Sequence, residues 1–154
     1  MIIFSEEIWI EAPPETVFGL SLDVDVHTGS MSDSGERAVA GVRSGRMGLG
    51  DTVTWQARHF GVPLRMTSTI SELRSPEFFV DEQVKGPFAL WRHEHRFVAN
   101  ESSLRDGGTL MRDDITFAAP LGPLGRLAEL AILRWYMPKL IRQRNEFLKA
   151  TAEA

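Results

Sequence analysis

Hydrophobic and polar residues alternate along most of the chain from residue 51 to residue 120, which is the pattern of β-strands. The alternating segments are 51–60, 64–73, 78–86, 89–99 and 109–119. The connections FGVP, RSPE, GP and NESSLRDGG that separate them are too short for the crossovers that parallel strands need. The sequence therefore predicts an antiparallel meander.

The first 42 residues predict a strand, two short helices and another strand. Segment IIFSEEIWIEA alternates loosely and is stopped by Pro13 and Pro14, which suit the first turn of a helix. We expect that helix over residues 14–22 and a second short helix or turn over 23–31. Segment 36–42 reads as a strand. The glycine-rich stretch that follows lacks the motifs of phosphate-binding loops and predicts turns and bulges.

Residues 122–154 predict one long C-terminal helix that begins at Gly122 and Pro123. Apolar residues recur from Leu127 to Phe147 at close to the helical period. Pro138 removes a hydrogen bond, so we expect a bend there. Residues 132–137 are apolar nearly all round, which predicts a place at a cavity mouth or in a homodimer interface. A sheet with one apolar face would curl around such a helix.

Composition narrows the class of protein. The 154 residues are 43% hydrophobic and 25% charged, which is typical of one soluble globular domain over 1–154. A net charge of −4 argues against nucleic acid as a partner. The absence of cysteine excludes disulfides and thiolate metal sites. There is no signal-peptide pattern and no apolar run of roughly 18 residues, so we expect a cytoplasmic protein with no transmembrane segment.

The segment GPFALWRHEHRF reverses the usual polarity of a half-buried strand. Trp91, His93 and His95 occupy one face, and charged residues occupy the other. Matching opposite charges across neighbouring strands gives a register for each hairpin. It places these pairs opposite each other: Asp81–His93, Gln83–Trp91 and Glu82–Arg92 in one hairpin, Arg92–Asp114 and Glu94–Arg112 in the next.

That alignment gives an inner face that is apolar at its margins and polar at its centre. The residues we expect to contact a bound ligand are Trp55, His59, Met66, Phe79, Asp81, Gln83, Trp91, His93, His95, Met111 and Asp113. Burying the carboxylates and imidazoles in a dry core would cost several kcal/mol unless they were paired. Two interpretations stay open: an internally satisfied Asp–His–Asp network, or the polar floor of a ligand-filled cavity.

The same four polar residues raise two chemical hypotheses. Asp81, Asp113, His93 and His95 could offer nitrogen and oxygen ligands to a metal, but no third histidine lies at a typical spacing, and we expect no metal and no cofactor. An Asp–His pair could act as a general acid/base, which makes these four residues the candidates for catalysis. No nucleophile elbow and no cysteine nucleophile is present.

The order of elements resembles the START-like superfamily, also called SRPBCC. The segments GLGDTVTWQARHFGVPLRMTS, FVDEQVKGPFALWRHEHRF and GGTLMRDDITFAAPLGPLG, with the final helix containing RN, are similar to a bacterial ligand-binding branch described as polyketide cyclase/dehydrase-like. The resemblance covers essentially the whole chain. It implies an α+β helix-grip fold, in which a curved antiparallel sheet of about seven strands surrounds the C-terminal helix.

We expect one of three functions, in order of preference. Members bind lipids, sterols, quinones, polyketides or plant hormones, so the first expectation is a cavity for a small hydrophobic or amphipathic molecule. A minority catalyse cyclisation or dehydration, and no catalytic residue carries over from the branch to this chain. The third expectation is a non-enzymatic interaction domain that works through the apolar surface of the C-terminal helix.

Overall fold

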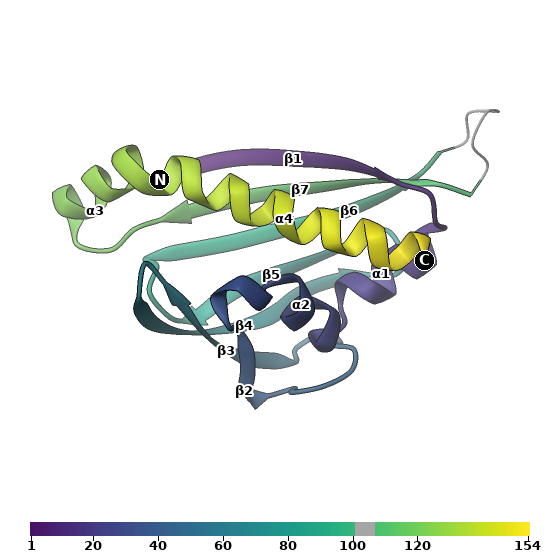
Figure 1. Ribbon diagram of the computed structural model, residues 1–154, viewed down its shortest axis with the longest axis horizontal. Coiled ribbons are helices and arrows are strands. Elements are labelled where there is room, and N and C mark those ends of the chain that lie inside the picture. The colour runs from purple at the N-terminus through teal and green to yellow at the C-terminus, as the bar shows by residue number, and fades with distance from the viewer. Residues whose placement is uncertain (101–106) are drawn as a thin grey trace.

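The computed structural model describes residues 1–100 and 107–154. Within this part of the chain, seven strands form one antiparallel sheet in the order β1-β7-β6-β5-β4-β3-β2, and a long helix lies across it (Figure 1). The strands are β1 (Ile2–Ile10), β2 (Arg37–Gly41), β3 (Thr52–His59), β4 (Val62–Arg74), β5 (Phe78–Lys85), β6 (Leu90–Ala99) and β7 (Thr109–Ala118). The predicted α+β helix-grip fold is confirmed. The predicted connection NESSLRDGG includes residues 101–106, which lie outside the described residues.

Short helices follow β1 as the sequence predicts. They are α1 (Pro14–Ser21), α2 (Val24–Ser30) and the 3₁₀ turn η1 (Ser32–Ser34). Pro14 occupies the first turn of α1, where no amide hydrogen is needed. Asp23 caps α2 by accepting hydrogen bonds from the backbone N–H groups of Asp25 and Val26.

The C-terminal helix is divided by a π-helical turn rather than only bent at its proline. It consists of α3 (Gly122–Ala128), η2 (Glu129–Leu133) and α4 (Arg134–Glu153), and Pro138 lies inside α4. Pro138 has no N–H for the carbonyl of Arg134, and a proline ring crowds the carbonyl four residues earlier. The wider turn just before Arg134 is one way to relieve such crowding.

The predicted register is correct between β5 and β6 and wrong between β6 and β7. Asp81 lies opposite His93, and Glu82 lies opposite Arg92. The ladder between β5 and β6 ends at that second pair, so Gln83 and Trp91 are not paired in it. Across β6 and β7, however, Arg92 lies opposite Thr116 and Glu94 opposite Asp114, a shift of two residues from the prediction.

Inner-face contacts explain the observed register better than the outer charges do. His95 lies opposite Asp113, and Trp91 lies opposite Phe117. The outer charges pair along a strand instead, as in the 2.9 Å contact between Arg112 Nη2 and Asp114 Oδ1. Exposed ion pairs contribute at most about 1 kcal/mol, which is too little to outweigh buried contacts.

Helix α4 contacts β1, α1 and α2, and it runs across the sheet along β1 and β7 (Figure 1). Apolar residues at the N-cap of α3, on α3, on η2 and at the start of α4 are exposed, and they are Leu121, Leu124, Leu127, Leu130, Ile132 and Trp135. The homodimer through this surface stays a prediction. No helix in the described ranges is both long enough and apolar enough to cross a membrane.

Candidate functional site

A cavity of about 460 Å³ lies between the sheet, the segment containing α1 and α2, and helix α4. Its walls are largely apolar, with contributions from Val53, Ile70 and Ile141. Eight of the predicted ligand-contacting residues line it, and they are Trp55, His59, Met66, Phe79, Asp81, Trp91, His93 and His95. Three others do not.

Gln83, Met111 and Asp113 have structural positions instead. The Gln83 side chain donates to the carbonyl of Phe88 at 2.8 Å and accepts from the Phe88 N–H at 3.2 Å, which fixes the turn between β5 and β6. Met111 is fully buried in the hydrophobic core. Asp113 is also fully buried and lies behind the two histidines rather than on the cavity wall. The alternation of residues along the strands predicted that these three side chains point inward, but not that they lie away from the cavity wall.

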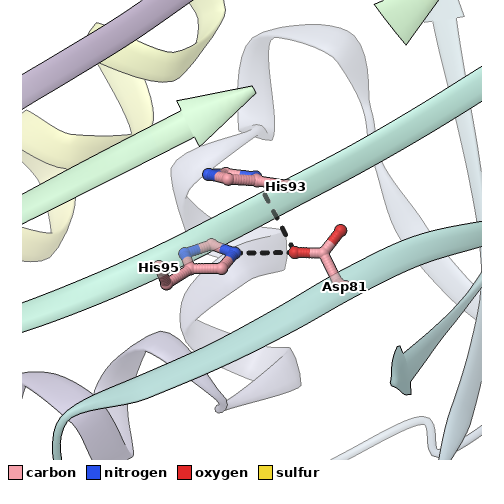
Figure 2. Close-up of side chains that lie close together, drawn as sticks. All are labelled: Asp81, His93 and His95. Atoms are coloured by element: carbon pink, nitrogen blue, oxygen red, sulfur yellow. Dashed lines mark hydrogen bonds and ion pairs between the residues drawn. The ribbon is translucent and has the colours of Figure 1, made fainter. Parts of the chain in front are cut away.

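The polar floor of the cavity is a cluster of imidazoles and carboxylates. His93 and His95 stack with their ring centroids 3.7 Å apart, and both face Asp81 on the neighbouring strand (Figure 2). His95 Nε2 lies 2.7 Å from Asp81 Oδ2, and His93 Nδ1 lies 3.7 Å from the same oxygen. Because an ionised carboxylate only accepts hydrogen bonds, His95 carries its proton on Nε2.

Asp113 completes the cluster on the side away from the cavity. Its Oδ1 lies 2.7 Å from His93 Nε2 and 3.1 Å from His95 Nδ1. The 3.1 Å contact lacks hydrogen-bond geometry. Two residues of α4 cover this carboxylate: Asn145 Nδ2 donates to Oδ2 at 2.7 Å, and Arg144 Nη1 lies 3.7 Å from Oδ1. The cluster therefore ties three strands to the helix.

Electrostatics keep both carboxyl groups ionised. Burial alone would raise the pKa of Asp81, but the hydrogen bond from His95 and the electrostatic interaction with His93 outweigh burial and lower the pKa to about 2. Burial would also raise the pKa of Asp113, but its contacts with His93 and His95 outweigh burial and hold this pKa well below its usual range. Burial, helped by the nearby charge of His95, lowers the pKa of His93. His93 is therefore neutral at pH 7.

The cluster has the composition of a metal site but not the orientation. Ligand atoms of Asp81, His93 and His95 lie within 4.8 Å of one another. Imidazole binds a metal in the plane of its ring, about 2.0–2.1 Å from the nitrogen for zinc. The two rings stack with planes only 25° apart, so their in-plane lone pairs do not converge on one nearby point. The residues fit a hydrogen-bonded network better than a metal centre.

Two further polar pairs lie on the cavity wall. His59 Nδ1 and the Tyr136 hydroxyl share a 2.6 Å hydrogen bond that joins β3 to α4. The His27 ring lies against Trp55 with centroids 4.3 Å apart and planes tilted by 34°, and His27 Nε2 lies 3.0 Å from Glu36 Oε2.

Sequence reasoning missed the helix side of the site. Arg144 and Asn145 lie between Ile141 and Leu148 at the spacing of a buried helix stripe, and all four residues are buried. Two adjacent polar residues inside such a stripe are a signal that could have indicated partners in the sheet. His27, Glu36 and Tyr136 carry no comparable signal.

Solved structures with this fold share little sequence with the chain. A crystal structure of TTHA0849 from Thermus thermophilus has a TM-score of 0.76 at 18% identity, covering 97% of this chain and 95% of that one. A START superfamily protein from Mycobacterium smegmatis has a TM-score of 0.73 at 12% identity, covering 98% and 97%. The Zhui aromatase/cyclase from Streptomyces sp. R1128 has a TM-score of 0.65 at 14% identity, covering 95% and 93%. No protein in the curated set matched.

A curved sheet that holds a long helix over a cavity defines a START-like helix-grip protein. The profile of the polyketide cyclase/dehydrase and lipid transport family matches residues 1–153. The chain belongs to that family.

Proposed function

We propose that the protein binds one small hydrophobic or amphipathic molecule in the cavity between the sheet and α4. The observation that carries this proposal is the 460 Å³ cavity with apolar walls and a single His–Asp floor. Ligand sites are typically about 300–1,000 Å³, mostly apolar, with a few polar groups that orient the guest. The family's association with lipid transport supports the same function.

Native mass spectrometry of the protein purified from its own host, followed by denaturing extraction, tests this proposal directly. We expect a stoichiometric small molecule, or a thermal shift with a member of a lipid, quinone and polyketide panel. Ala57→Leu places extra carbons in the cavity and should weaken binding, because Ala57 lines it. Gln56→Leu is the matched control, since the Gln56 side chain bonds Arg65 rather than lining the cavity. An empty protein that no panel member stabilises would contradict the proposal.

A cyclase or dehydratase is the second candidate, because the cavity floor holds an oriented imidazole. The 2.7 Å contact with Asp113 fixes the proton of His93 on Nε2 and leaves Nδ1 with a lone pair. Such an enzyme would show a pH–rate limb that disappears when the base is replaced by alanine. Turnover of a polyketide substrate that survives both His93→Ala and His95→Ala would reject this candidate.

A further inference from the structure

Resting on the proposed function, we infer that the cavity selects a ligand whose polar group is a neutral or cationic hydrogen-bond donor, received by Asp81, and that it rejects anionic head groups.

Asp81 is the polar group that the cluster presents to the cavity. Its side chain is 22% exposed, whereas those of His93 and His95 are 5% and 2% exposed. Oxygen Oδ2 lies 2.7 Å from His95 Nε2 and 3.7 Å from His93 Nδ1, and the other oxygen points away from the two rings (Figure 2). That second oxygen, Oδ1, has a 3.4 Å contact with Trp91 Nε1, which is long for a hydrogen bond. A ligand donor can therefore approach Oδ1.

The only arginine or lysine among the described residues that line the cavity already has polar partners within the protein. Arg144 has a side chain that is 6% exposed, and its Nη1 donates to Asn145 at 3.0 Å and lies 3.7 Å from Asp113. The carboxylates of Asp81 and Asp113 and this one guanidinium sum to a formal charge of −1. A carboxylate or phosphate ligand would bring a second negative charge to a site that is largely withdrawn from water, which is costly.

Glu36 provides an independent observation of the same kind. It lines the cavity, and its Oε2 is buried without a hydrogen-bond partner, although His27 Nε2 lies 3.0 Å away in poor geometry. A buried acceptor that makes no hydrogen bond is unfavourable, so a donor on the guest would stabilise it. Asp81 and Glu36 thus both favour a donating ligand.

Isothermal titration at pH 7 with four naphthalenes tests the inference, because the compounds share one apolar body. They are 2-naphthol, which donates, 2-methoxynaphthalene, which does not, 2-naphthoate, which is anionic, and 2-naphthylmethylamine, which is cationic. We expect 2-naphthol and the amine to bind at least tenfold more tightly than the ether and the acid. In Asp81→Asn this preference should fall to threefold or less, while the ether binds as before and reports an intact cavity. Glu82→Gln, a change of the next residue on the outer face, should leave the preference unchanged.

The outcomes separate the inference from the proposed function. Binding of the ether or the acid as tightly as the naphthol would overturn the donor preference and leave the cavity function standing. A preference that persists in Asp81→Asn would also overturn the assignment to Asp81. If none of the four compounds binds, the proposed function fails and the inference fails with it.

Discussion

His93 donates from Nε2 to Oδ1 of Asp113 across 2.7 Å, and that carboxylate has no exposed surface. The pair connects the cavity floor, which includes His93, to the buried carboxylate of Asp113 behind it. Asp113 also accepts from Asn145 on α4, so one carboxylate links β6, β7 and the helix. The floor of the cavity is thus connected to helix α4 through this buried carboxylate.

Asp113→Ala should strongly destabilise the protein. The change leaves His93 and Asn145 without an acceptor and Arg144 without a nearby counter-charge, and breaking a buried ion pair costs about 3–5 kcal/mol. Urea unfolding measures the loss. Asp114→Ala is the matched control, because its ion pair with Arg112 is exposed and contributes less than about 1 kcal/mol. Equal losses in the two variants would show that the buried cluster is not stabilising.

Unfolding free energy should fall as the pH falls below about 6.5. The pKa of His93 is lower in the folded protein than its usual 6.5, so the unfolded chain binds this proton first and acid favours unfolding. A second fall should follow below pH 3.8 as the pH approaches the folded-state pKa of Asp81, which is about 2. Urea titrations between pH 2 and pH 8 measure both. In His93→Gln the upper fall should be reduced, and an unchanged profile would assign it to another group.

Tyr136→Phe should speed ligand entry and exit. The bond between His59 and Tyr136 lies beside Phe60 and Val62, which line the cavity and are also exposed, so this is where the cavity meets solvent. Losing a hydrogen bond of this kind changes stability by about 0.5–1.5 kcal/mol at most. Stopped-flow measurements with 2-naphthol should show both rate constants rising several-fold. Trp135→Phe, on the neighbouring exposed residue, should leave them unchanged, and unchanged rates in Tyr136→Phe would place the entrance elsewhere.

Gly41→Ala should be more destabilising than Gly45→Ala. Both glycines have positive φ, 71° and 76°, which costs an alanine roughly 1–2 kcal/mol. A Cβ on Gly41 would also lie 2.2 Å from the carbonyl oxygen of Thr52, whereas nothing lies within 4 Å of one on Gly45. The difference in unfolding midpoint therefore isolates the close approach of β2 and β3. Equal effects would mean that backbone strain accounts for both.

The sequence predicted the elements well because strand alternation and helical periodicity extend over many residues. The segment from 89 to 99, for example, became β6 with Trp91, His93 and His95 on its inner face. Its register against β7 was wrong because a shift of two residues keeps every side chain on the same face. The outer charges could not decide between the two registers.

The site was only half predictable for a related reason. Asp81, His93 and His95 follow from the phasing of neighbouring strands, whereas Arg144 and Asn145 reach the cluster from α4. The distance between helix and sheet depends on packing over the whole molecule. The same holds for the division between Met111, which is buried in the hydrophobic core, and Trp91, which lines the cavity.

The Asp113 cluster has a consequence for the size of the space above it. Asn145 and Arg144 approach the carboxylate through polar contacts of 2.7 Å and 3.7 Å, so these side chains set how thick the molecule is at the cavity floor. Shorter or apolar residues at these positions would let α4 settle toward the sheet. In this architecture, the capacity of the chamber can thus be altered through Asn145, a residue that does not line it.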